Sequence, residues 1–166
     1  MGRKVSVRLF AVAVAAGSLA MIPMASPSSA LTSKVSCGAE LSAKPASTTG
    51  KITATASLSK CVNLAPTAKN VSKINTATLS GTSTTTWANG KGTTLQKVTY
   101  KLATKAQGLG KCPAATTALR IFVTATTTGG TGAALKAIPK GSIGKSSICD
   151  RKDGTAVLEP GTRATF

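Results

Sequence analysis

Apolar side chains in this chain recur at every second position over several stretches. Residues 52–59 read ITATASLS, in which apolar and hydroxyl side chains alternate, and residues 95–105 (LQKVTYKLATK) and 118–128 (ALRIFVTATTT) repeat the pattern. Successive side chains of a β-strand point to opposite faces of a sheet, so this period predicts half-buried strands. Residues 74–80 alternate more weakly, and shorter candidate strands are residues 135–138, 147–149 and 156–158.

Turn signals separate these stretches, and no helical period of useful length accompanies them. The signals fall at residues 49–50, 89–90, 108–111, 127–132, 139–141 and 159–161. Threonine is frequent, and its branched β-carbon suits strands. About seven or eight short strands at this spacing predict an antiparallel β-sandwich, immunoglobulin-like in general architecture, with a small β-barrel as the alternative. We expect residues 44–50 and 127–132 to be surface loops.

The only tryptophan, Trp87, lies two residues before an Asn-Gly pair. Asn-Gly between strand-forming residues is a strong signal for a two-residue hairpin loop, because both central positions need positive φ. Such a loop at Asn89 and Gly90 pairs Trp87 with Gly92. Trp87 then either packs within the hairpin or serves as a platform on which a sugar ring stacks, with Lys91 beside it.

The first thirty residues have the pattern of a secretory signal peptide. Three basic residues precede an apolar run at residues 9–22, and these 14 residues are fewer than the about 20 that span a bilayer. Pro23 and the small residues Ser28 and Ala30 then match the region before a signal-peptidase cut. We therefore expect residues 1–30 to be cleaved and residues 31–166 to form a single secreted β domain, without a transmembrane segment in the mature chain.

Large apolar residues are scarce in residues 31–166, and this makes the cysteines important. Leu, Ile, Val and Phe supply 25 of these 136 residues, a share at which disorder competes with folding. An even number of cysteines in an exported domain indicates disulfides. Three connectivities are possible, and we favour the sequential one because it closes the shorter loops. The cysteines are Cys37, Cys61, Cys112 and Cys149. Loops of 24 and 37 residues would each stabilise the fold by about 3–4 kcal/mol in the chain-entropy model.

Acidic residues are scarce and histidine is absent, which argues against most catalytic chemistry. The chain has no histidine, and no carboxylate side chain lies between Glu40 and Asp150. General acid–base catalysis and activated nucleophiles normally need His, Asp or Glu, and zinc or calcium sites need His, thiolate or clustered carboxylates. Asp150 and Asp153 fit a polar turn better than a metal loop. We therefore expect a protein that is not an enzyme and has no catalytic residue, metal site or cofactor.

The remaining charge is strongly positive. Residues 31–166 keep 18 Lys or Arg against four acids, a net charge of +14. Lys97, Lys101 and Lys105 fall on one face of a strand if it stays regular, and neighbouring lysines are then roughly 13 Å apart at about 3.3 Å per residue. An exported cation meets anionic polymers of the cell envelope. Lysine outnumbers arginine by 15 to 3 in this part, which indicates loose attraction rather than bidentate phosphate recognition.

The order of these elements resembles a group of small secreted actinobacterial proteins. The residues that carry the likeness are Cys37, the strand ASLSKC ending at Cys61, ATLSGTSTTTWANGKGTT at residues 77–94, and the late cysteine followed by LEPGTRATF. In that group a strand rich in threonine and glycine leads into a Trp-x-Asn-Gly turn. The resemblance implies export and a β fold; the group has no assigned activity and supplies no functional residues.

The sequence thus predicts a secreted, extracellular, cationic protein that associates with anionic polymers of the cell wall. Candidate ligand-binding residues are Trp87, Lys91, Lys97, Lys101 and Lys105. Nucleic acid is not an expected partner, because the stacking aromatics of such modules are missing. A carbohydrate-binding module that uses Trp87 is the first alternative. A protease inhibitor that presents Lys111, beside Cys112 and Pro113, is the second.

Overall fold

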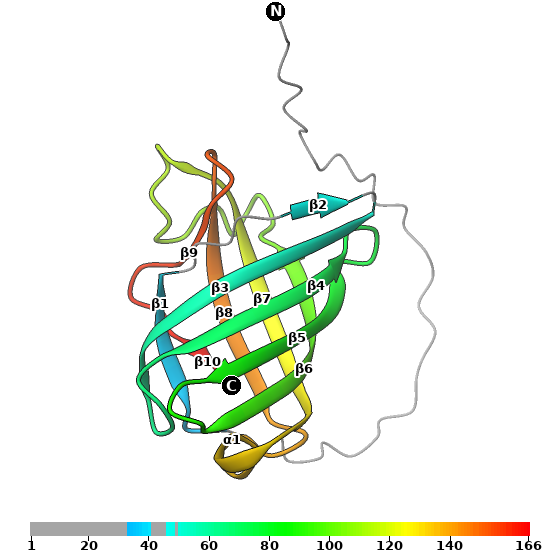
Figure 1. Ribbon diagram of the computed structural model, residues 1–166. Coiled ribbons are helices and arrows are strands. Elements are labelled where there is room, and N and C mark those ends of the chain that lie inside the picture. Colours follow the sequence, from blue (N-terminus) through cyan, green and yellow to red (C-terminus); the bar gives the residue numbers. More distant parts are fainter. Residues whose placement is uncertain (1–32, 41–45, 49) are drawn as a thin grey trace, which may run out of the picture.

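The structure, a computed structural model, describes residues 33–40, 46–48 and 50–166 (Figure 1). The predicted signal peptide lies outside the described residues. Among those residues, no helix has the length and apolar character needed to cross a membrane. Ten strands and one short helix follow one another along the chain. Their bounds are β1 (Ser36–Glu40), β2 (Ala46–Thr48), β3 (Lys51–Val62), β4 (Ala68–Asn75), β5 (Ser80–Trp87), β6 (Gly92–Leu102), β7 (Thr117–Gly130), α1 (Gly132–Ala137), β8 (Ile143–Arg151), β9 (Ala156–Leu158) and β10 (Ala164–Thr165).

The strands form one continuous antiparallel sheet that curls into a nearly closed barrel (Figure 1). Its order is β10-β1-β3-β4-β5-β6-β7-β8-β9, and β2 pairs with β3 off this path. The barrel closes where β10, paired with β1, reaches β8. The Lys145 amide of β8 donates to Thr165 Oγ1 (2.7 Å), and that hydroxyl donates back to the Lys145 carbonyl (3.1 Å). The predicted antiparallel all-β class is confirmed, in the form of the barrel and not of two stacked sheets.

One predicted loop and two predicted strands are wrong. The weak strand expected at residues 74–80 is mostly the turn at residues 76–79, between β4 and β5. Residues 127–130 belong to β7, which continues to Gly130, and residues 132–137 form α1, so the strand expected at residues 135–138 is a helical turn followed by Ile138. Ala134 and Ile138 lie four residues apart and are fully buried, and the Ile138 amide donates to the Ala134 carbonyl (2.8 Å). A helix of six residues is too short for its period to be distinguished from a strand.

The segment at residues 44–50 is also not simply a loop. Residues 46–48 form β2 and pair with residues 51–53 of β3. Gly50 between them has φ 75°, as a tight turn requires.

The hairpin at Asn89 and Gly90 has the predicted register. Both residues have positive φ (56° and 64°), and Trp87 pairs with Gly92 across the turn. A side chain at Gly92 would clash with the carbonyl of Thr131, so the chain that leads into α1 can cross the hairpin only over glycine.

The apolar core gathers at the end of the barrel that α1 covers (Figure 1). The Trp87 and Phe166 rings meet edge to face with centroids 5.0 Å apart, and Trp87 Nε1 donates to Thr94 Oγ1 (2.8 Å). Trp87 is only 2% exposed, so in this structure the ring has the packing role and presents no open face for stacking. The cluster also contains Val35, Cys37, Leu58, Ala65, Ala68, Ala134 and Ile138.

Next to this core, the inner face of the barrel is polar. The Asn70 amide donates to Ser83 Oγ (2.6 Å) and Thr85 Oγ1 (2.8 Å), and its oxygen accepts from Ser72 Oγ (3.0 Å). The register continues this layer from Ser83 to Gln96 and from Gln96 to Thr127. Hydroxyl and amide groups thus occupy positions that apolar side chains fill in most small barrels.

Both disulfides are present with the sequential pairing, Cys37–Cys61 and Cys112–Cys149. The first joins β1 to the end of β3, with Cys37 fully buried in the core. The second ties the segment between β6 and β7 to β8. The predicted connectivity is confirmed.

Because Cys37 also packs in the core, the two disulfides should contribute differently to the free energy of unfolding. We expect Cys112→Ser/Cys149→Ser to lower the free energy of unfolding by about 3 kcal/mol. Cys37→Ser/Cys61→Ser should lower it by more, because the change at Cys37 would also place a hydroxyl group in the apolar cluster. Urea unfolding of the three proteins measures the difference. Equal losses, or an unchanged midpoint in either double variant, would contradict this ranking.

The polar layer gives a second expectation. Gln96 is 3% exposed, and its Nε2 has no hydrogen-bond partner among the described residues. Gln96→Met removes this unpaired donor at similar volume, so we expect the free energy of unfolding to rise by about 1 kcal/mol. Ser83→Ala is the control of opposite sign, because it deprives Asn70 of an acceptor. Thermal unfolding compares them; destabilisation by Gln96→Met would show that its amide is satisfied in solution.

Candidate anion-binding site

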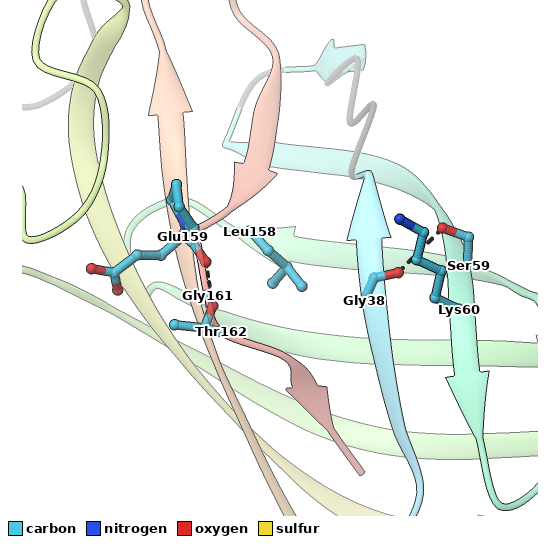
Figure 2. Close-up of a pocket in the computed structure, with 8 residues that line it drawn as sticks. Gly38, Ser59, Lys60, Leu158, Glu159, Gly161 and Thr162 are labelled. Carbon is cyan, nitrogen blue, oxygen red and sulfur yellow. Dashed lines mark hydrogen bonds between the residues drawn. The ribbon is translucent and has the colours of Figure 1, made fainter.

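A shallow hollow of about 220 Å³ lies at the seam of the barrel, between β1 and the segment that follows β9 (Figure 2). Gly38 of β1, Ser59 and Lys60 of β3, and residues 158–162 line it. The segment is folded into a tight turn: the amide and the hydroxyl of Thr162 both donate to the Glu159 carbonyl, at 3.0 and 2.7 Å. This turn is the one predicted at residues 159–161, and it forms one wall of the hollow.

Glu159 is 4% exposed, and its carboxylate is fully engaged on the far side of the turn. Arg120 donates to its Oε2 from Nε (3.1 Å) and Nη2 (2.7 Å), and the Lys111 amide donates to its Oε1 (2.8 Å). Burial alone would raise the pKa of Glu159. The hydrogen bonds from Lys111, Ser147 and Arg120 and the charge of Arg120 outweigh burial, so the pKa is lowered and the group stays ionised.

Three cations lie close to the glycines that line the hollow, and of these only Lys60 is itself part of the lining. The Lys60 side chain lies over Gly38, since a Cβ at Gly38 would sit 3.6 Å from Lys60 Cβ and 3.9 Å from its Cδ, and Figure 2 shows it beside Gly38. The same Cβ would be 3.8 Å from Arg163 Nη1. A Cβ at Gly161 would lie 3.6 Å from Lys111 Nζ. Glycine at positions 38 and 161 therefore leaves room for cationic side chains at the rim.

Arg163 is held in place by its other nitrogens. Its Nε donates to Ser36 Oγ (2.9 Å), and its Nη2 donates to the carbonyls of Ser36 (3.1 Å) and Lys60 (2.6 Å). These bonds tie the segment before β10 to β1 and β3. Nη1 makes no hydrogen bond within the described part of the chain, so it stays available at the edge of the hollow.

A second cationic feature covers the outer face of β4–β6. We call it the basic face and define it by Lys69, Lys73, Lys97 and Lys101, all of which are exposed. The register places Lys73 opposite Thr82 and Thr82 opposite Lys97, so these two lysines are separated by two strand spacings, roughly 10 Å. Lysines on one strand of the basic face are four residues, roughly 13 Å, apart. No carboxylate belongs to any of these strands.

The structure brings together only some of the predicted ligand residues. Lys97 and Lys101 lie on the basic face, whereas Lys105 lies in the turn after β6, which ends at Leu102. Lys91 lies in the β5–β6 turn, where its carbonyl accepts from the Ala134 amide (2.8 Å). Trp87 is buried.

Sequence reasoning missed the other members of both features. Lys69 and Lys73 alternate outward on β4, but the inward residues of that strand are largely small or polar, so its period of two was hidden. Lys60 and Arg163 are 103 residues apart and meet only through the pairing of β1 with β3 and β10. No local signal could have found that contact.

The turn predicted around the two late aspartates follows β8 and contains Asp153, whereas Asp150 belongs to β8 itself. Asp153 Oδ1 accepts from the amide (2.9 Å) and hydroxyl (2.7 Å) of Thr155, which lowers the pKa of Asp153. Within residues 33–40, 46–48 and 50–166 no group of three or more metal-ligating side chains is found.

Comparison with known proteins adds no relative. No protein-family model matches the chain, and neither a curated protein nor a solved structure matches it. The resemblance to small secreted actinobacterial proteins therefore stays a prediction.

The lowered pKa of Glu159 predicts how the free energy of unfolding depends on pH. A carboxyl whose pKa is lower in the folded state stabilises the fold above its unfolded pKa, and that contribution is lost as pH falls through the lower, folded value. Burial, followed by the charge of Asp153, raises the pKa of Asp150, so that group contributes with the opposite sign.

Glu159→Gln should cost about 3 kcal/mol at pH 7, because Arg120 keeps its charge without a partner. It should cost much less near pH 3.

Urea unfolding of the wild type and Glu159→Gln at both pH values measures this difference. A loss in Glu159→Gln that is the same at pH 7 and pH 3 would contradict an ionised Glu159 in the folded protein.

Proposed function

We propose that this protein is a secreted, non-enzymatic cationic protein that associates with anionic polymers of the cell envelope through the basic face. The observation that carries the proposal is the arrangement of Lys69, Lys73, Lys97 and Lys101 on β4 and β6, which flank β5; none of the three strands contains a carboxylate. Among the described residues the one ion pair is Arg120–Glu159, which lies away from these lysines. The charges of the basic face are therefore not neutralised by any ion pair in the part of the chain that the structure describes.

The spacing of the basic face suits a flexible polyanion. Separations of roughly 10–13 Å exceed the Debye length of about 8 Å at physiological salt, so the lysines repel one another only weakly. Each can still attract a charge that comes close, and a polymer with repeating negative groups can engage several at once. Threonines between the lysines keep the surface open and hydroxylated. Export is supported by the predicted signal peptide and by two disulfides, which persist in oxidising compartments.

The alternatives have less support. A sugar-stacking role for Trp87 would need the ring exposed, and the ring is enclosed by the core and by α1. An inhibitory role for Lys111 would need a projecting reactive loop, whereas the backbone there is tied to buried Glu159 and to the disulfide at Cys112.

A matched pair of variants tests the proposal. The basic-face variant replaces Lys69, Lys73, Lys97 and Lys101 by Gln; the control replaces four other exposed lysines, Lys91, Lys105, Lys136 and Lys140, so that both lose the same charge. Each lysine near an anionic surface contributes about 1 kcal/mol, so we expect the basic-face variant to bind purified cell walls at least about tenfold more weakly in low salt.

The control should lose clearly less, and a few hundred millimolar salt should release the wild type. Equal losses in the two variants would leave net charge alone as the cause and remove the basic face from the account. Retention that resists salt would contradict the proposal as a whole.

A further inference from the structure

We infer that the hollow at the barrel seam is a discrete binding site for one phosphate group. The inference rests on the proposed function in one respect: an envelope polymer would supply the phosphate. It differs in kind from the basic face, because it assigns a single anionic group to one shallow hollow that Lys60 lines and that Arg163 and Lys111 approach at its glycines.

The charges around the hollow are one-sided. Lys60, Lys111 and Arg163 Nη1 all border the glycines that line it. The only carboxylate in the lining, Glu159, is bound by Arg120 and by the Lys111 amide, and its lowered pKa reflects that pairing. An anion in the hollow would meet Lys60, with Arg163 Nη1 close to Gly38 and Lys111 Nζ close to Gly161.

The backbone of β3 is strained at Lys60, the residue whose side chain lies over Gly38. Lys60 has φ 49°, in the left-handed region that a residue with a Cβ enters with about 1–2 kcal/mol of strain. The irregularity in the pairing of β1 with β3, between Ser36 and Gly38, lies beside it. Such bulges redirect side chains, and here the Lys60 side chain lies over Gly38, where it lines the hollow.

The size and donors of the hollow fit an oxyanion. Its volume of about 220 Å³ is several times the roughly 30 Å³ that one water occupies, so it accommodates a phosphate with part of its hydration shell. Nη1 of Arg163 offers N–H groups in a fixed plane, because Nε and Nη2 are already anchored. The two ammonium groups add charge without fixed direction, which suits a phosphate that is attached to a chain.

Titration with two probes, inorganic phosphate and a soluble glycerol-phosphate oligomer, tests the inference by ¹⁵N NMR of the oxidised protein. We expect saturable shifts of the Gly38, Gly161 and Thr162 amides with either probe. Tighter binding of the oligomer would identify the polymer as the source, and equal binding would identify free phosphate. Lys60→Asn suits the left-handed backbone, and Lys111→Gln keeps the amide that binds Glu159.

Each of these variants should weaken the seam shifts at least about fivefold, while Lys97→Gln on the basic face should leave them unchanged. Shifts that stay linear in concentration, or that respond equally to all three variants, would overturn the inference. Cell-wall retention separates the two proposals. Salt-sensitive retention without saturable seam shifts removes only the phosphate site. Saturable seam shifts with retention that resists salt remove only the proposed function.

Discussion

The structure depends on how the segment from Glu159 to Phe166 closes the barrel. Four contacts along these eight residues act on four different parts of the sheet. Glu159 is anchored by Arg120 of β7, Arg163 bridges β1 and β3, Thr165 caps the free edge of β8, and Phe166 enters the core beside Trp87. Without them, β1 and β9 would be the unpaired edges of an open sheet, and exposed edges invite pairing with other chains.

The same closure brings the cationic side chains of the seam close to the glycines that line the hollow. Arg163 reaches β3 because β10 pairs with β1, and Lys111 reaches the turn because Glu159 accepts its amide. Closing the barrel therefore collects cations from segments that are far apart in sequence. The basic face has a different origin, since it arises from alternation along β4 and β6 and from their shared partner β5. One feature is set by topology and the other by strand periodicity.

This division also explains what the sequence could predict. Period-two alternation and the Asn-Gly turn are local signals, and β3, β6, β7 and the hairpin register follow from them. They left open whether Trp87 packs or is exposed, and they did not reveal β4. The sequential disulfides were favoured because their loops are short, and the structure agrees. The choice of a barrel over a sandwich depends on contacts of residues more than one hundred positions apart, such as Arg163 with Lys60. The helix at residues 132–137 is stabilised by burial of Ala134 and Ile138 against the core. Six residues are too few for a helical period to be recognised in the sequence.

Closure of the barrel by this segment is tested most directly by native-state hydrogen exchange at two amides. The Lys145 amide donates to Thr165 Oγ1, and the Phe166 amide donates to the Val35 carbonyl. If the seam is closed in solution and opens only when the whole domain unfolds, both amides should exchange within about tenfold of the slowest amides in the centre of β6, such as Val98. Exchange several orders of magnitude faster at both positions, with β6 still protected, would show that the barrel is open at the seam and contradict the account.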